Sequence, residues 1–349
     1  MSKAINMAIL GIGRAGYNMH TEEMAKYPEL FNIVAACDID PDHCKSMEKK
    51  IGCRTYTDMD ELLKDEEVEL ISIATRSPDH VNHAIKCAEA GKYVFVEKPV
   101  ALTYADALRL AEAAKKFPGK IFLRHNRRFE PEFQHIREII AEGLLGDVYE
   151  IKLRRNNYQR RNDWQTIIEC GGGQLNNWGP HIIDHGLRLL ESPMVELWSD
   201  LKKVAAVGDA EDHLKVIMKG ENGRIIDLEI SGGSAISEPQ YLIHGSKGAL
   251  RCEGSDITMK YLDPEVELQE IEADPSSPPI ENSFGNAEEL KWVEKTFKAE
   301  PATGCDTHVI WKHLYEAIKE GVPFPITIEE GVEVVKVTEM VKKNSEFAV

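Results

Sequence analysis

Short apolar runs separated by amphipathic segments fill the first third of the chain. The apolar runs lie at residues 5–10, 32–37, 70–74, 93–96 and 121–123. Such runs are typical of strands buried on both faces of a parallel sheet. Between them, apolar residues recur at helical spacing, for example over 103–116. This alternation predicts a doubly wound parallel α/β sheet, which we assign to a first domain at residues 1–123.

After Leu123 the pattern changes. A helix is predicted at 131–142, and in a later segment Ile226, Leu228 and Ile230 alternate with acidic residues, as in an antiparallel sheet with one covered face. We assign residues 124–349 to a second domain. Its predicted strands lie at 147–158, 197–206, 213–219, 224–232, 240–244, 249–253 and 257–262.

The end of the chain returns to a helical pattern. Thr327 and Glu330 have the spacing of a capping box. The apolar residues that follow form two overlapping helical stripes, so a helix at about 328–345 is expected to pack back on the first domain. Before it, the proline-rich stretch 274–279 predicts a loop.

Composition narrows the class of protein. A length of 349 residues favours two domains, and 42% apolar with 29% charged residues is ordinary for a globular protein. No apolar run reaches the ~18 residues of a membrane span, and the first residues lack the pattern of a signal peptide, so we expect a cytoplasmic location. Seven scattered cysteines without a Cys-x-x-Cys pair favour free thiols over disulfides or a zinc site.

Charge excludes two classes of partner. A net charge of −17 argues against nucleic acid and against an anionic membrane, both of which reward clustered Lys and Arg. One basic island breaks this background, at residues 124–128 with Arg154, Arg155, Arg160 and Arg161. It either lines a cleft or forms a solvated face.

A glycine motif follows the first strand at once. Its sequence, Gly11-Ile12-Gly13-Arg14-Ala15-Gly16, leads into a helical segment and matches Gly-x-Gly-x-x-Gly in the required strand–turn–helix setting. The first glycine makes the turn, the second lets the backbone approach a pyrophosphate, and the third allows close helix packing. The alternative is a glycine-rich turn without a ligand.

The second strand ends in Asp38, 22 residues beyond Gly16. An acidic residue at this position can bind a ribose 2′-hydroxyl and would repel a 2′-phosphate, so NAD is preferred over NADP. Arg14 or Arg54 could weaken this preference. Alternatively, Asp38 only caps the helix that begins near Pro41.

Candidate side chains follow two other strands. Glu97-Lys98-Pro99 comes directly after the run 93–96, and the turn Thr75-Arg76-Ser77-Pro78 leads to His80. The carboxyl ends of parallel strands are where open α/β sheets bind ligands, and Pro99 restricts the conformation of Lys98. The alternatives are a solvated lysine and a surface histidine.

The segment 171–185 has the densest group of polar side chains in the second domain. Three glycines precede it, and in one helix Asn177, His181 and either Asp184 or His185 would share a face. His181 beside Lys98 would form a pair able to move a proton and to stabilise an oxyanion. A core histidine is the alternative for His181. A metal site from His181, Asp184 and His185 lacks further ligands, and we predict no metal.

Taken together, these motifs resemble the Gfo/Idh/MocA oxidoreductases, which include inositol and glucose–fructose dehydrogenases. The resemblance covers nearly the whole chain. It implies an N-terminal Rossmann domain and a C-terminal α+β domain with a large, mostly antiparallel sheet. It also implies a site between them and a homodimer or homotetramer packed through the open face of that sheet.

The resemblance also implies roles for single residues. Lys98 would bind the reacting hydroxyl and His181 would accept its proton as hydride leaves for nicotinamide. The remaining cofactor positions would be Gly11, Ile12, Gly13, Arg14, Ala15, Asp38, Thr75, Arg76, His80, Glu97 and Asn126. Substrate contacts are expected from Arg127, Tyr158, Arg160, Trp164, Trp178, Asp184 and His185.

One position departs from the family pattern. Asn177 stands where many relatives carry an aspartate, and an amide cannot accept a proton. The base is then His181 alone, or the work passes to Tyr158, His185 or Asp184. We therefore expect an NAD-dependent dehydrogenase acting on a secondary alcohol of a sugar, cyclitol or glycoside. The alternatives are an NAD-dependent glycosidase that oxidises its sugar transiently, and a non-catalytic NAD or sugar sensor.

Overall fold

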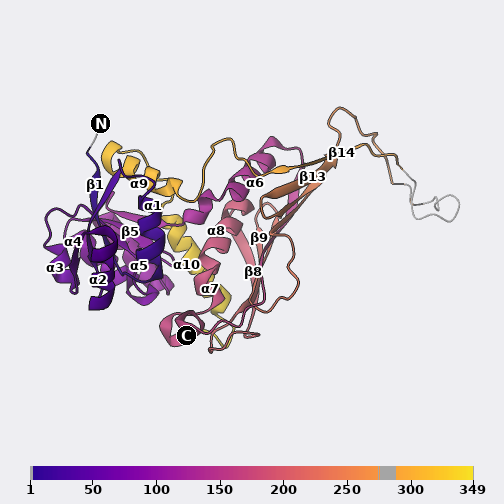
Figure 1. Cartoon of the computed structure of the whole chain (residues 1–349). Helices are drawn as coiled ribbons and strands as arrows, with labels where there is room; N and C mark the ends of the chain where they lie inside the picture. Colours follow the sequence, from indigo (N-terminus) through magenta and orange to yellow (C-terminus); the bar gives the residue numbers. More distant parts are fainter. Residues whose placement is uncertain (1–2, 274, 276–287, 349) are drawn as a thin grey trace.

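Two sheets, each with its own hydrophobic core, make up the molecule (Figure 1). This description rests on a computed structural model, which describes residues 3–273, 275 and 288–348. One sheet is parallel and has six strands, and the other is mostly antiparallel and has eight. The predicted fold class, a doubly wound parallel sheet followed by an α+β domain, is confirmed.

The first sheet has the strand order β3-β2-β1-β4-β5-β6, and all neighbouring strands are parallel. The order reverses between β1 and β4, so a crevice forms at their carboxyl ends, where ligands bind in such sheets. The prediction missed only β3, which is three residues long. The strands are β1 (Ile5–Leu10), β2 (Phe31–Cys37), β3 (Arg54–Tyr56), β4 (Leu70–Ile73), β5 (Tyr93–Glu97) and β6 (Ile121–Arg124).

Helices connect these strands, and polar side chains cap several of them. Asp40, Asp58 and Thr103 accept hydrogen bonds from the first turns of α2, α3 and α5, which satisfies donors that a helix leaves unpaired. After the glycine motif, a π-helical turn, η1, leads into a short α-helix. The elements are η1 (Ala15–His20), α1 (Thr21–Met24), α2 (Pro41–Ile51), α3 (Met59–Leu63), η2 (Ser77–Asp79), α4 (His80–Glu89) and α5 (Tyr104–Lys116).

The second sheet has the order β14-β13-β12-β11-β7-β10-β9-β8. All its pairs are antiparallel except β7 with β10. The edge strand β14 was not predicted, because most of its side chains are exposed and the two that pack against the core, Val293 and Phe297, are separated by the charged Lys295. The strands are β7 (Val148–Asn156), β8 (Met194–Lys202), β9 (His213–Gly220), β10 (Ile225–Ser231), β11 (Tyr241–Gly245), β12 (Gly248–Glu253), β13 (Asp256–Leu262) and β14 (Trp292–Lys298).

The predicted strand at 197–206 is wrong at both ends. β8 begins earlier, at Met194, because that residue pairs with Gly220 of β9. It ends earlier, because the backbone N–H groups of residues 204–206 turn away and donate to the carboxylate of Asp212. The proline-rich loop predicted at 274–279 lies, apart from residue 275, outside the described residues.

Two helices, α7 (Gln174–Asn177) and α8 (Gly179–Leu190), contact the inner face of the second sheet and lie on the side of the first domain (Figure 1). A third, α6 (Pro131–Glu142), adds apolar side chains to the same core. Asn177 and His181 thus belong to two consecutive helices that meet at Trp178, and not to the single helix that was predicted.

The last two helices return to the first domain. α9 (Val309–Glu320), which was not predicted, places the fully buried Trp311 and its neighbours in the core of the six-stranded sheet. α10 (Ile328–Lys342) contacts both α5 and α8. The capping box predicted at Thr327 and Glu330 is confirmed.

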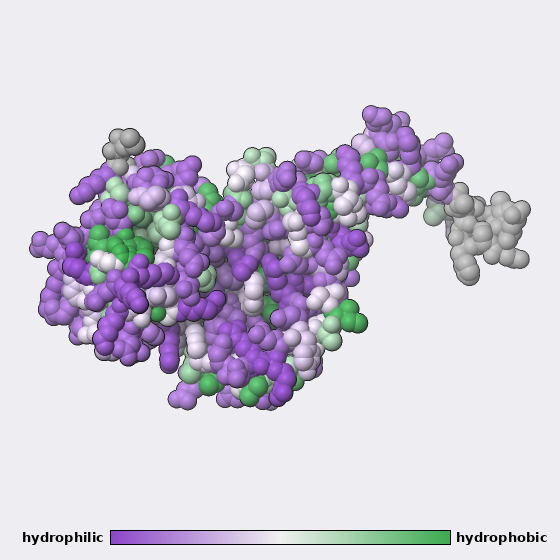
Figure 2. Space-filling model, in the orientation of Figure 1, coloured by the Kyte–Doolittle hydropathy of each residue, from purple (hydrophilic) through white to green (hydrophobic). Residues whose placement is uncertain are grey.

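The surface drawn in Figure 2 is largely hydrophilic, including the strip between the two lobes. Within the described residues, no helix is long and apolar enough to cross a membrane. All seven cysteines are unpaired thiols.

Candidate active site

The glycine motif lies at the crevice of the first sheet. Gly11 has φ +93°, and a Cβ there would come within 2.6 Å of the Ala74 carbonyl carbon after β4. A Cβ on Gly16 would overlap the carbonyl oxygen of Gly11, whereas a Cβ on Gly13 would meet no protein atom within 4 Å. The first and third glycines therefore permit close packing, and Gly13 leaves open space beside the backbone.

Asp38 connects β2 to the same loop. Its Oδ2 accepts a 2.6 Å hydrogen bond from the backbone N–H of Ile12, and Nδ1 of His43 lies 3.3 Å from that oxygen. The alternative that Asp38 only caps α2 is wrong, because Asp40 is the capping residue. Asp38 thus holds the glycine loop in place and presents a carboxylate beside it.

Glu97, at the end of β5, is fully occupied by protein partners. Its carboxylate accepts from Nη1 of Arg124 at 2.6 Å and lies 2.9 Å from Nε2 of His20. Burial alone would raise the pKa of this carboxyl, but Arg124 and His20 hold it well below its usual range. Arg124 also binds Glu23, which accepts from the indole N–H of Trp311 in α9. The ion network fixes the end of β5 just before Lys98.

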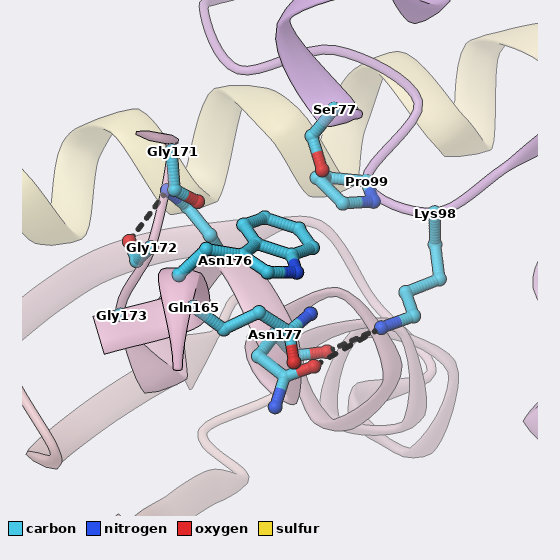
Figure 3. A pocket seen from close by; sticks show the side chains of 10 residues that line it. Ser77, Lys98, Pro99, Gln165, Gly171, Gly172, Gly173, Asn176 and Asn177 are labelled. Atoms are coloured by element: carbon cyan, nitrogen blue, oxygen red, sulfur yellow. Dashed lines mark hydrogen bonds between the residues drawn. The ribbon is translucent and has the colours of Figure 1, made fainter. Parts of the chain in front are cut away.

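Lys98 extends from this end of β5 towards the second domain (Figure 3). Its Nζ donates to the backbone carbonyl of Asn177 at 2.8 Å and lies 3.4 Å from the Asn177 Oδ1. Burial lowers the pKa of the Lys98 ammonium to about 8, and the charges of Arg127 and Arg14 act in the same direction. The Lys98–Pro99 peptide bond is cis.

His181 lies buried in the first turn of α8. Its Nδ1 has no hydrogen-bond partner among the described residues, although that atom is sealed from solvent. Burial lowers the pKa of the imidazole well below its usual value, and the charges of Lys98 and Arg127 lower it further. His181 is therefore neutral at pH 7 and able to accept a proton.

A pocket opens where the two domains meet at Lys98. Figure 3 shows side chains from both domains turned towards it, and Asn177 joins Lys98 on one side. Trp164, predicted as a substrate contact, lines the same pocket. Its lining consists of Ser77, Lys98, Pro99, Trp164, Gln165, Gly171, Gly172, Gly173, Asn176 and Asn177.

The other predicted cofactor residues lie in the loops after β4 and β6. His80 is buried, not on the surface: its Nδ1 donates to the carbonyl of Pro99 at 2.7 Å, and its Nε2 lies 3.1 Å from the carbonyl of Thr75. It thereby joins the loops after β4 and β5. The Thr75 hydroxyl lies 3.1 Å from His83, Arg76 is exposed, and Asn126 is buried just after β6.

Asp184 and His185, predicted as substrate contacts, use their polar atoms within the protein. Asp184 accepts two hydrogen bonds from Arg128, which hold its pKa below the usual range although burial alone would raise it. The two ring nitrogens of His185 lie at the Tyr241 hydroxyl and the Arg127 carbonyl, and burial lowers its pKa to about 4. Both residues therefore position α8.

The remaining predicted contacts are divided between the site and the surface. Arg127 lies over the ring of Trp178, with its Cζ 4.3 Å from the ring centroid, and the Trp178 ring lies 6.0 Å from that of His181. Tyr158 is 60% exposed and Arg160 is exposed. Ile12 is buried, whereas Arg14 is exposed at the glycine loop, next to Ala15.

Sequence reasoning missed several residues that shape the site. Glu211 is buried against Gly173, where its carboxylate occupies the space of a side chain and accepts from the Leu175 N–H at 2.9 Å. Glu130 binds both Arg127 and Arg155. Glu211 has no local signal, because its partner Leu175 lies 36 residues earlier. For Glu130 the three-residue spacing from Arg127 is a local signal, but its second partner, Arg155, lies 25 residues away.

The first domain can hold a dinucleotide. The open side of Gly13 is a cradle that a side chain would fill, and the backbone N–H groups at the start of η1 suit a pyrophosphate. The carboxylate of Asp38 lies at the end of the neighbouring strand, where a ribose would lie. Among the parts of the chain that the structure describes, no group of three His, Cys, Asp or Glu side chains could hold a metal ion.

Two family models match the chain. Residues 5–125 match the oxidoreductase family with an NAD-binding Rossmann fold, and residues 133–251 match the GFO/IDH/MocA C-terminal domain. Together they cover more than half of the sequence.

Similar proteins include enzymes of different reactions. The scyllo-inositol 2-dehydrogenase (NADP(+)) IolW of Bacillus subtilis is 25% identical over 82% of this chain and 80% of its own length. The 2,7-anhydro-N-acetylneuraminate hydratase of Mediterraneibacter gnavus is 31% identical over 73% of this chain and 68% of its own. A solved NAD-binding protein from Listeria innocua matches in fold, with a TM-score of 0.83, 23% identity and coverage of 99% and 98% of the two chains.

Proposed function

The chain belongs to the GFO/IDH/MocA family of oxidoreductases, and we propose that it is an NAD-dependent dehydrogenase acting on a secondary alcohol of a sugar, cyclitol or glycoside. The observation that carries this proposal is the pair Lys98 and His181. Lys98 is a half-buried cation and His181 a buried, neutral imidazole, and the charge of Lys98 acts on the His181 ring where the two domains meet.

This chain's residues have distinct parts in the reaction. NAD, when bound, supplies the hydride acceptor. The hydroxyl oxygen of the substrate gains alkoxide character as hydride leaves, and the Lys98 ammonium stabilises that charge. His181 accepts the hydroxyl proton, since Asn177 has no group that can. Asn177 instead holds Lys98 in place through its backbone carbonyl.

NAD is the proposed cofactor in preference to NADP. The carboxylate of Asp38 is fixed by the Ile12 N–H, and Asp40 adds a second negative charge nearby, so a 2′-phosphate would be repelled. The name of the relative IolW specifies NADP(+), so the cofactor preference of this protein has to be measured directly. Hydride transfer compared with both cofactors at equal concentration should favour NAD at least tenfold.

We also propose a homodimer or homotetramer through the outer face of the second sheet. Val195 and Trp198 of β8 and Tyr149 of β7 are more than half exposed on these strands. Size-exclusion chromatography with light scattering gives the mass of the oligomer directly. A monomer at micromolar concentration would contradict this assembly.

A single-turnover experiment tests the main proposal. Enzyme and NAD in excess are mixed with each member of a panel of sugars, cyclitols and glycosides, absorbance reports NADH, and mass spectrometry identifies the product. We expect stoichiometric NADH and a ketone from at least one member. Failure of every member to react would overturn the assignment.

A second candidate is a redox-neutral enzyme that oxidises its sugar transiently, eliminates or adds at a neighbouring carbon–oxygen bond, and reduces the carbonyl again. The hydratase of Mediterraneibacter gnavus, at 31% identity, supports this candidate. The same experiment separates the two, because cleavage or hydration would appear without accumulated NADH.

A further inference from the structure

We infer that the substrate carries a carboxylate group, held by Arg127 and Arg155 beside Trp178. This inference rests on the proposed function, because it names the class of substrate for the same site. The inference narrows the candidate substrates from sugars and cyclitols in general to sugar acids.

Two guanidinium groups share a single protein carboxylate at this place. Arg127 binds one oxygen of Glu130 through Nη1, and Arg155 binds the other through Nη2 at 2.9 Å. Two positive charges therefore face one negative charge. The side chains of Arg127 and Arg155 are 32% and 17% exposed, so a ligand can reach them, whereas Glu130 is 9% exposed beneath them.

Both guanidinium groups keep donors for a further ligand. A guanidinium carries five N–H donors. Throughout the described residues, Glu130 is the one side chain that accepts a hydrogen bond from each group, through one nitrogen of each. None of the other nitrogens is among the atoms sealed from solvent. Arg127 and Arg155 already hold the planar carboxylate of Glu130 between them. Their remaining N–H donors can bind the carboxylate of a substrate with the same geometry.

The pair lies close to the reacting groups. Trp178 has the Arg127 Cζ at 4.3 Å and the Arg155 Cζ at 5.2 Å from its ring centroid. The same ring meets that of His181 edge-on at 6.0 Å, and Trp178 directly follows Asn177. A carboxylate bound here would lie a few bonds from a hydroxyl at Lys98 and His181.

The local charge is opposite to that of the whole protein. The chain as a whole carries a net charge of −17. At the site, however, the hydrogen-bond acceptors of Lys98 are neutral oxygens of Asn177. The nearby carboxylate of Glu97 is bound by Arg124 and His20. Lys98, Arg127 and Arg155 thus bring three positive charges to this part of the site, against the two carboxylates of Glu97 and Glu130. Such a focus attracts an anionic substrate, and a neutral polyol would gain nothing from it.

Binding of matched acid and ester pairs tests the inference. The full-length protein with NAD is titrated with D-glucuronate, D-galacturonate and N-acetylneuraminate, each beside its neutral methyl ester, by calorimetry and tryptophan fluorescence. We expect at least one acid to bind tenfold or more tightly than its ester. Equal binding of every pair, or binding of none, would overturn the inference.

Three variants locate the effect. Arg155→Gln should reduce the preference for the acid to less than threefold. Glu130→Gln removes the competing carboxylate and should increase that preference, which a purely structural role would not produce. Arg251→Gln, on the exposed face of β12, serves as the matched control and should leave the preference unchanged. Tighter binding of glucose 6-phosphate than of any acid would overturn the assignment of a carboxylate.

Hydride transfer on the same pairs separates this inference from the proposed function. NADH formed equally well from acids and esters, and unaffected by Arg155→Gln, would overturn the inference and leave the dehydrogenase. Selective binding of an acid, without NADH or turnover, would support the inference and overturn the dehydrogenase.

Discussion

Lys98 of the first domain donates a 2.8 Å hydrogen bond from its Nζ to the backbone carbonyl of Asn177 in the second. That carbonyl lies at the end of α7, where a helix leaves its last carbonyl acceptors unpaired. The candidate lysine is thus positioned by both domains. Any change in how the domains meet should alter its charge and its position together.

Replacing this lysine tests its role in catalysis. Lys98→Met should lower the single-turnover rate roughly 10²–10³-fold, as loss of one group that stabilises an oxyanion does. Burial disfavours the ammonium, so the midpoint of thermal unfolding should stay the same or rise. NAD binding, measured by fluorescence, is the control. A variant with the wild-type rate would remove Lys98 from the mechanism.

The rate should depend on pH through the same group. Burial lowers the pKa of Lys98 to about 8, so the ammonium is lost as pH rises through that value, and kcat/KM should fall above about pH 8. Lys98→Arg keeps its charge, so any residual activity should lack this alkaline decline. A wild-type profile that is flat to pH 10 would contradict the assignment.

Asn177→Asp should move the alkaline limit. The new carboxylate would lie near Nζ, since Oδ1 of Asn177 is 3.4 Å from it, and a negative charge raises the pKa of an ammonium. The pH at which kcat/KM falls should therefore increase. Asn177→Ser, which adds no charge, provides the comparison and should produce no upward shift.

Two glycines of one motif should respond differently to alanine. A Cβ on Gly16 would overlap the Gly11 carbonyl oxygen, so Gly16→Ala should destabilise the protein by about 1–3 kcal/mol. A Cβ on Gly13 meets no protein atom, so Gly13→Ala should keep its unfolding midpoint but bind NAD at least tenfold more weakly. Chemical denaturation and cofactor titration measure the two effects. Equal NAD binding by Gly13→Ala and wild type would argue against a pyrophosphate at this loop.

Trp311 should stabilise the first domain from the far end of the sequence. Trp311→Ala should cost about 3–5 kcal/mol of unfolding free energy, because it leaves a cavity in a closed core and removes a donor to Glu23. Trp292→Ala, at a position that is 44% exposed, is the matched control and should cost far less. Similar losses in the two variants would contradict this account of the core.

Local sequence pattern was sufficient for five of the six strands of the first sheet, because continuous apolar runs and glycine spacing can be seen in neighbouring residues; the short β3 was missed. Local pattern also failed for α9 and β14. β14 is an exposed edge strand that depends on β13 for its pairing, and α9 faces a core built mainly by residues some 200 positions earlier. The parallel pairing of β7 with β10 is likewise set by the three-dimensional arrangement.

The same distinction holds within the site. The positions of Lys98 and the glycine loop follow from strand ends, which the sequence marks clearly. The partners of Asp184 and His185 could not be predicted, because Arg128 and Tyr241 lie 56 residues away from them in opposite directions. A polar residue on a helix looks the same in sequence whether it faces a substrate or a buried guanidinium.

The return of α9 to the first sheet has a consequence for synthesis of the protein. The ribosome releases the six strands early, yet the residues that close their core, Ile310, Trp311 and Leu314, emerge after nearly nine tenths of the chain. Until then an apolar surface of the nascent domain stays uncovered and open to chaperones or to aggregation. A chimera that takes its second domain from a relative would therefore need an α9 whose side chains fit the core of the first domain.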